Sequence, residues 1–131
     1  MKLTVNVDGG ARGNPGPSAI GVVVRGEDGG VLLERGEKIG DATNNVAEYK
    51  ALIAGIALAK ELGADQIELI GDSELVINQI LGRYKVKNAG IKPLHAEAKA
   101  ALANFDSWAI SHVRREMNAD ADRLVNEALD A

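Results

Sequence analysis

Four acidic residues stand at points where separate predicted elements of the chain begin or end. Asp8 follows an alternating strand pattern, and Glu48 lies in the first turn of a long helical pattern. Asp72 follows another strand pattern, and Asp122 opens the last helical pattern. Carboxylates brought together repel one another and raise each other's pKa unless a cation lies between them. Hard oxygen ligands at such density suit Mg²⁺ or Mn²⁺, so the sequence predicts a metal-dependent phosphoryl-transfer enzyme.

The elements that must position these acids follow from the apolar patterns. We predict strands over residues 3–7, 20–25, 31–39, 67–70 and 107–114. Four helices are predicted: one after Thr43-Asn44-Asn45 to about Leu62, one from a Ser73 cap to Gly82, one from Pro93 to about Asn104, and one from about Ala119 to Leu129. The order β-β-β-α-β-α-α-β-α indicates an α/β fold with a five-stranded mixed sheet flanked by helices.

Composition narrows the class of protein. The 131 residues include no cysteine, so we predict one domain over residues 1–131 without disulfides or a thiolate metal site. The N-terminus lacks the apolar run of a signal peptide, and no stretch could span a bilayer, so we expect a cytoplasmic protein that does not bind membranes. The net charge is −4, but Arg83, Lys85, Lys87 and Lys92 form an acid-free basic run. This charge distribution allows a nucleic-acid partner.

The first two acids also have plain structural interpretations. In the segment Asp8–Gly16, the acid could simply cap a turn, or the glycines could let a substrate approach the carboxylate and free N–H groups. Asn45 as a helix N-cap with Glu48 three residues later would form a capping box. That alternative leaves Thr43 and Asn44 unexplained at a helix N-terminus, which is a natural phosphate site.

The other two acids differ in how well the sequence assigns them. Asp72 is hardly needed as a helix cap, because Ser73 already offers one, and an acid at the carboxyl end of a buried strand lies where α/β sheets bind ligands. Asp120 and Asp122 both flank the apolar stripe of the last helix, so periodicity does not separate them. Both could equally serve only to complement the helix dipole.

Four motifs in chain order resemble those of the type 1 ribonuclease H family. They are Asp8-Gly9-Gly10 with Gly13-Asn14-Pro15-Gly16-Pro17, then Thr43-Asn44-Asn45-x-x-Glu48, then Asp72-Ser73, then Asn118-x-x-x-Asp122-x-Leu124. The resemblance covers nearly all of the chain and implies the ribonuclease H-like fold. It also implies an endoribonuclease that hydrolyses the RNA strand of RNA/DNA hybrids with two Mg²⁺ ions, which Mn²⁺ can replace, leaving 5′-phosphate and 3′-hydroxyl ends. A monomer without a protein partner is expected.

The resemblance also implies roles for individual residues. The catalytic metal ligands would be Asp8, Glu48, Asp72 and Asp122, which selects Asp122 over Asp120. Substrate contacts would come from Gly9, Gly10, Asn14, Thr43, Asn44 and Asn45. The asparagines would meet the minor groove and the ribose 2′-hydroxyls of the RNA strand, and the threonine would meet a phosphate of the DNA strand. Arg83, Lys85 and Lys87 stand where other members have a longer basic extension, and form either a reduced substrate channel or a solvated loop.

The chain departs from the family in the loop before the last acid, which lacks the histidine that many members carry. Arg115 is the candidate cation near the leaving group or product phosphate, or else a surface arginine. His112 lies inside a predicted strand, and His95 is expected to be a surface or packing residue. Two other functions stay open: a non-catalytic hybrid-binding module, and another nuclease of the same superfamily. Converging carboxylates would repel phosphates in a pure binder, and another nuclease would not need the paired asparagines.

Overall fold

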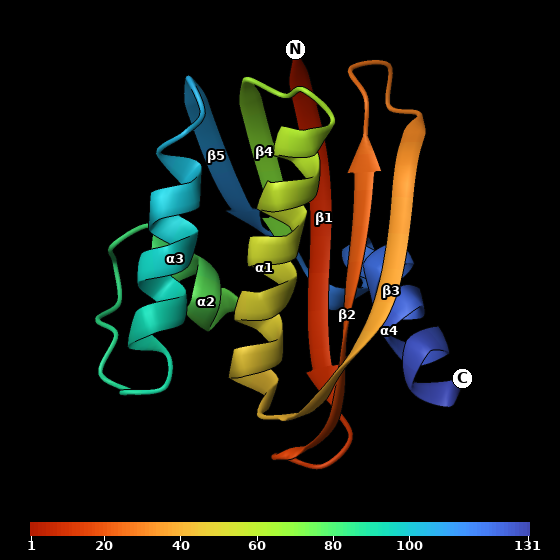
Figure 1. Ribbon diagram of the computed structural model, residues 1–131, viewed down its shortest axis with the longest axis vertical. Helices are drawn as coiled ribbons and strands as arrows, with labels where there is room; N and C mark the ends of the chain where they lie inside the picture. Colours follow the sequence, from red (N-terminus) through yellow and green to blue (C-terminus); the bar gives the residue numbers. More distant parts are fainter.

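The computed structural model describes residues 1–131 and contains one five-stranded sheet in the order β3-β2-β1-β4-β5 (Figure 1). The strands are β1 (Lys2–Ala11), β2 (Gly16–Arg25), β3 (Val31–Ala42), β4 (Gln66–Gly71) and β5 (Ser107–His112). Strands β1, β2 and β3 pair antiparallel, whereas β4 runs parallel to β1 and β5 runs parallel to β4. The helices are α1 (Asn44–Glu61), α2 (Glu74–Ile80), α3 (Lys92–Leu102) and α4 (Ala119–Asp130), with a 3₁₀ turn η1 (Arg115–Asn118) before α4. The predicted α/β class, mixed sheet and order of elements are confirmed.

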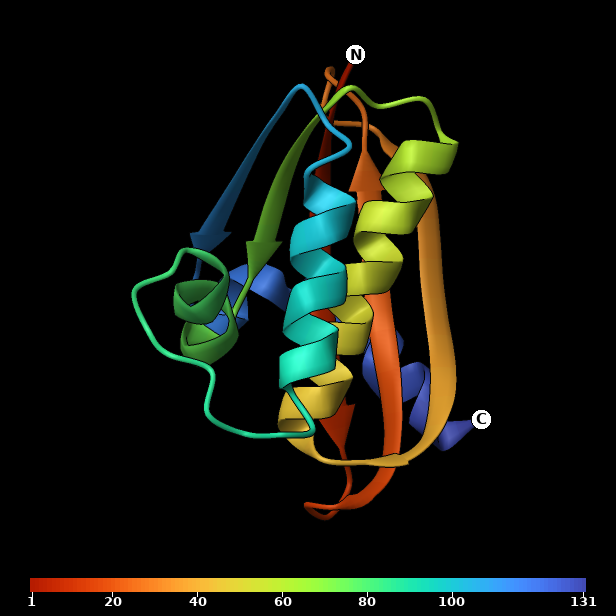
Figure 2. The same ribbon diagram turned by 60° about the vertical axis from the view of Figure 1, so that its left-hand side comes forward.

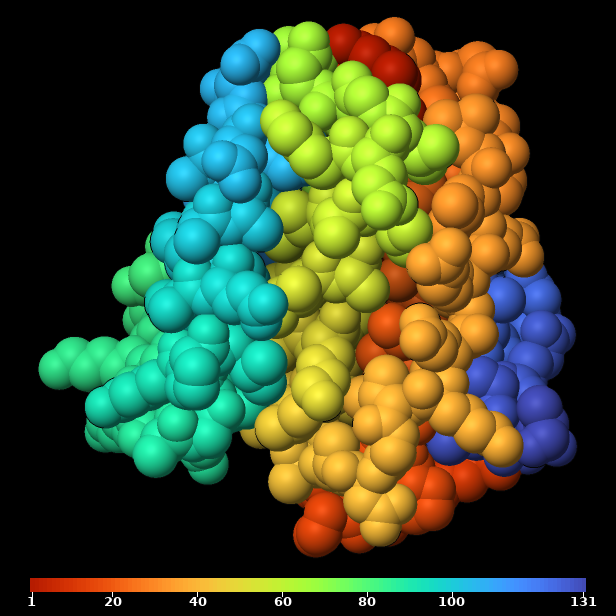
Figure 3. All heavy atoms as spheres, viewed as in Figure 1, coloured from red at the N-terminus to blue at the C-terminus, as the bar shows by residue number.

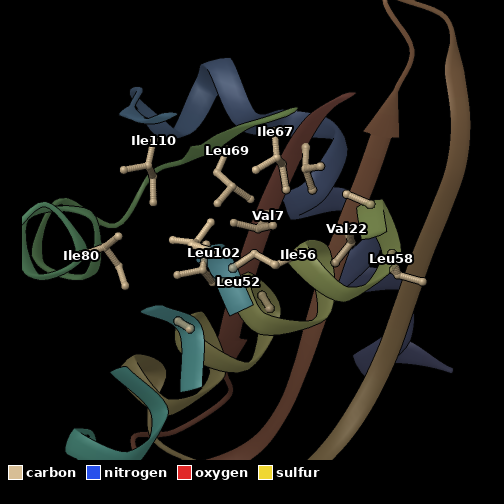
Figure 4. Close-up of a cluster of buried hydrophobic side chains, with 14 of the residues drawn as sticks. Val7, Val22, Leu52, Ile56, Leu58, Ile67, Leu69, Ile80, Leu102 and Ile110 are labelled. Atoms are coloured by element: carbon tan, nitrogen blue, oxygen red, sulfur yellow. The ribbon is translucent and has the colours of Figure 1, made fainter. Parts of the chain in front are cut away.

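Helices cover both faces of the sheet. Helices α1 and α3 lie side by side on one face, and α4 lies on the other (Figures 1 and 2). The main core fills the space between the sheet and α1 and α3, and it is almost wholly aliphatic (Figure 4). Its members include Val7, Val22, Leu52, Ile56, Leu69 and Leu102. Each such side chain stabilises the fold by about 1.5–3 kcal/mol on full burial, so aliphatic residues suffice without a large aromatic core.

Two glycines let α4 lie directly on the sheet. A Cβ atom at Gly21 of β2 would collide with the carbonyl of Ala121, and one at Gly36 of β3 would collide with the carbonyl of Leu124. Strand glycines therefore permit a close approach of the helix backbone. The approach brings the first turns of α4, including Asp122, against the sheet.

Several element boundaries differ from the predicted ones. Strand β1 does not end before Asp8, because Gly9 and Gly10 continue the ladder and pair with Ile20 and Ala19. Strand β3 continues to Ala42, and β5 ends at His112 instead of reaching residue 114. The expected loop before α4 contains the turn η1. No helix combines the length and the apolar character needed to cross a membrane.

Candidate active site

Three carboxylates from three separate elements meet at one place on the sheet. Asp8 lies in β1, Asp72 directly follows the neighbouring parallel strand β4, and Glu48 lies in the second turn of α1. One carboxylate oxygen of each lies within 4.8 Å of those of the other two. We call Asp8, Glu48 and Asp72 the carboxylate trio.

The start of α1 is pressed against β1 at Gly9. A Cβ atom there would collide with the carbonyl of Ala47, and the Gly9 N–H donates a hydrogen bond to Glu48 Oε1 at 3.2 Å. The alternative interpretation of Asn45 and Glu48 as a capping box does not hold, because Asn45 is not the N-cap. Thr43 is the N-cap and accepts from the backbone N–H of Val46 at 3.2 Å, so α1 begins earlier and Glu48 is turned to the sheet.

The fourth acid, Asp122, lines the same cleft from α4. Arg115 donates a hydrogen bond from Nη2 to Asp122 Oδ1 at 3.1 Å. Asp120 is outside the cleft lining and forms an ion pair with Arg25 at 2.7 Å. The structure thus separates two acids that helical periodicity could not.

Asn118 fastens the start of α4 to β1. Its side chain is buried, and its Nδ2 group donates to the carbonyl oxygen of Val7 at 2.9 Å. Its Oδ1 atom accepts from Asn6 Nδ2 at 3.0 Å. Because Asp8 follows Val7, and Asp122 lies one helical turn after Asn118, these bonds hold the two acids in register.

Burial and mutual repulsion raise the proton affinity of the trio. Burial, followed by the charges of Glu48 and Asp72, raises the pKa of Asp8 to about 10. Burial also raises the pKa of Glu48 to about 7, although hydrogen bonds from Asp8 and the Gly9 N–H oppose it. The pKa of Asp72 is raised by burial, against the influence of Asp8 and Arg115. Without a cation, Asp8 therefore keeps a proton at neutral pH.

A polar cleft of about 460 Å³ surrounds these groups, and only three of its 15 lining residues are hydrophobic. Of the other predicted site residues, Gly9, Gly10, Asn44, Asn45 and Arg115 also line it. Three polar residues that the sequence did not assign to the site also line the cleft, namely Arg12, Ser73 and Asn126. Asn126 donates to the backbone carbonyl of Asp122 at 3.2 Å. Its position four residues after that acid, one helical turn further on, was the feature of the sequence that could have placed it in the cleft.

Asn14 and Asn44 join the loop between β1 and β2 to the start of α1. The backbone N–H of Asn44 donates to Asn14 Oδ1 at 3.0 Å, and the Ala11 N–H donates to Asn44 Oδ1 at 2.9 Å. Asn14 and Thr43 are exposed but do not line the cleft. The predicted substrate-binding residues of these two segments are therefore held side by side.

The remaining candidates lie away from the acids. Arg83, Lys85 and Lys87 are exposed in the connection between α2 and α3, outside the cleft lining (Figure 2). His112 is exposed at the end of β5 and does not line the cleft either. His95 is half-buried and packs against Tyr49, as expected for a packing residue.

The sheet order, the helices on both faces and the acidic cleft on β1 and β4 define the class of ribonuclease H-like proteins. Residues 6–128 match the family described as reverse transcriptase-like. A ribonuclease HI of Halobacterium salinarum is 49% identical over 94% of this chain, which spans 62% of that relative. The chain spans only 36% of a bifunctional Mycobacterium tuberculosis protein that is 46% identical.

Solved structures agree with this assignment. The crystal structure of ribonuclease H1 from Halobacterium salinarum matches with a TM-score of 0.97 and 46% identity, covering 99% of this chain and 98% of that one. LC11-RNase H1, crystallised with an RNA/DNA hybrid, matches with a TM-score of 0.92 and 42% identity, covering 98% and 96%. The chain belongs to the type 1 ribonuclease H family.

Proposed function

We propose that this chain is an endoribonuclease that hydrolyses the RNA strand of RNA/DNA hybrids and leaves 5′-phosphate and 3′-hydroxyl ends. The observation that carries the proposal is the convergence of the carboxylate trio and Asp122 in one polar cleft, with Asn44 and Asn45 at its edge. A protein that only bound a hybrid would gain nothing from acids that repel phosphates. The hybrid bound by LC11-RNase H1 supports the choice of substrate.

The donor set fits a hard divalent cation. Asp8 is 6% exposed and shares its surroundings with two other carboxylates, an arrangement that a cation would relieve. We propose that the trio and Asp122 hold two Mg²⁺ ions, which Mn²⁺ can replace. When bound, Mg²⁺ supplies an activated water and neutralises charge on the leaving oxygen.

The chain's own residues bind and orient the substrate. Asn44 Oδ1 accepts a hydrogen bond from the Ala11 N–H. The Asn44 side chain therefore has its amide N–H₂ group available to donate to a substrate. Together with Asn45 and the side-chain-free backbone at Gly9 and Gly10, it can reach ribose 2′-hydroxyls, which only the RNA strand offers.

Arg115 supplies a fixed positive charge beside the acids of the cleft. It pairs with Asp122 and is 75% exposed, so its guanidinium can also reach a phosphate oxygen. We propose that it takes the place of the missing loop histidine near the leaving group or product. The monomeric state and the cytoplasmic location both stay predictions.

Labelled RNA/DNA, RNA/RNA and DNA/DNA duplexes incubated with and without Mg²⁺ test the proposal. We expect cuts only in the RNA strand of the hybrid, only with the cation, and with 5′-phosphate ends. Binding of the hybrid without cleavage would replace the proposal by a binding module. Cleavage of the DNA duplex would indicate another nuclease of the superfamily.

A further inference from the structure

A buried polar bridge joins three helices next to the catalytic acids. Tyr49 directly follows Glu48 in α1, is 0% exposed, and donates from its hydroxyl to Gln79 Oε1 of α2 at 2.7 Å. Nε2 of His95, from α3, lies 3.1 Å from the Gln79 carbonyl oxygen, and the His95 ring packs edge-on against Tyr49. We call Tyr49, Gln79 and His95 the polar bridge.

The polar bridge ends on the basic segment 83–87. Gln79 Nε2 donates to the backbone carbonyl of Lys85 at 3.4 Å. The neighbouring Val86 is half-buried and packs against the core, whereas Lys85 and Lys87 are exposed. Within residues 85–87, the bond to Gln79 is the only hydrogen bond. One buried apolar side chain and one buried amide therefore fix the path of residues 85–87, whereas the backbone N–H groups of Arg83 and Tyr84 donate to the carbonyl of Asn78. The segment lies at the left of the view in Figure 3.

Packing alone does not require polar groups at this place. Phenylalanine and leucine would fill similar space among the aliphatic side chains, and a satisfied buried pair contributes little net stability over an apolar one of the same shape. Hydrogen bonds are directional, however, whereas apolar contacts are not. The specific effect of the polar bridge is therefore on the path of the segment that carries the lysines.

We infer that Tyr49 and Gln79 are positioning residues for nucleic-acid binding, which hold segment 83–87 so that its cations meet the phosphate backbone of the hybrid. The inference deepens the proposed function and rests on it. The bridge starts one residue after Glu48, and α2 starts just after Asp72, so the segment is placed relative to the acids themselves.

The test uses the double variant Tyr49→Phe/Gln79→Leu, which removes both polar groups and leaves no unpaired partner between them. We expect its melting temperature, and the rise caused by Mg²⁺, to stay close to those of the wild type. For hybrid cleavage we expect KM to rise about fivefold with kcat unchanged. The slope of the logarithm of affinity against the logarithm of salt concentration should become shallower by about the amount that one phosphate contact contributes. Lys85→Ala should raise KM in the wild type but much less in the double variant.

Tyr84→Phe is the matched control. Tyr84 lies in the same segment, is 45% exposed and donates to Glu74 at 3.3 Å, so losing its hydroxyl should leave KM unchanged. If the double variant unfolds, Tyr49→Phe alone, which frees Gln79 from its anchor, should show the KM effect in smaller measure. An unchanged KM, a parallel loss of kcat and Mg²⁺ response, or additive effects of Lys85→Ala would each overturn the inference. If the wild type does not cleave hybrids, the proposed function fails, and the same comparisons of hybrid affinity by fluorescence anisotropy still decide the role of the bridge.

Discussion

The substitution Asp8→Asn removes one charge from the carboxylate trio while keeping the shape of the side chain. In the wild type without a cation, folding forces this carboxyl into a buried place beside two other acids. The asparagine amide has no charge to bury and can still donate a hydrogen bond towards Glu48. We therefore expect the variant to be more stable than the wild type in the absence of divalent cations, although it no longer cleaves RNA.

The size of the gain follows from the pKa shift. The pKa of Asp8 rises from 3.8 to about 10, so at pH 7 the folded protein holds a proton that the unfolded chain has released. Between pH 3.8 and pH 7 this costs at most about 4 kcal/mol, at about 1.4 kcal/mol per pH unit. An effective dielectric constant nearer 20 than 4 reduces it, so we expect about 2 kcal/mol. For a chain of this size that corresponds to a rise of about 6 °C in melting temperature.

Thermal unfolding followed by circular dichroism in EDTA and in Mg²⁺ measures both halves of the prediction. In EDTA at pH 7 the variant should melt above the wild type. The wild type should gain about 2.7 kcal/mol when Mg²⁺ is at 100 times its dissociation constant, and the variant should gain far less.

Two results would refute the electrostatic account. One is a lower melting temperature for Asp8→Asn than for the wild type in EDTA at pH 7. The other is a variant that responds to Mg²⁺ as the wild type does, because the cation would then bind elsewhere. Asp120→Asn is the matched control, since it removes an acid that is paired with Arg25 outside the cleft.

Three further predictions follow from the site. In EDTA, the stabilisation of Asp8→Asn relative to the wild type should be absent below about pH 4 and should grow as pH rises towards 10. The wild type loses stability over this range because its folded state holds protons, at pKa values raised in Asp8 and Glu48, that the unfolded chain has already released. Melting temperatures across the range measure the difference. Asp122→Asn should lower kcat at least about 100-fold, whereas Asp120→Asn should leave hybrid cleavage near the wild-type rate. Asn44→Ala removes the acceptor of the Ala11 N–H and should raise KM for the hybrid about tenfold with a loss of stability of about 1 kcal/mol, measured by steady-state kinetics and thermal melts.

The order of elements could be predicted because it is written in local patterns. The alternation of Leu3, Val5 and Val7 and the helical stripe of α1 are strong enough to define their elements without tertiary information. That Asp8, Glu48 and Asp72 share one site was implied by the family motifs, and the structure brings one carboxylate oxygen of each within 4.8 Å of the others.

What the sequence did not reveal depends on partners that are distant along the chain. Gly9 and Gly10 look like loop residues, and only their pairing with β2 makes them strand. Glu48 satisfies a capping-box pattern, yet the structure gives it the Gly9 N–H as a partner. Asp120 and Asp122 are distinguished only by their neighbours once α4 packs on the sheet, where Asp120 pairs with Arg25. The polar bridge likewise forms only when α1, α2 and the segment at Lys85 are all in place.

The four acids are drawn from the first strand, the first long helix, the middle of the chain and the final helix. Until α4 has emerged and docked on Gly21 and Gly36, the last acid is missing from the cleft. The complete set of four acids is therefore assembled only when translation of this region is over, and a copy that ends before α4 lacks Asp122 in the cleft.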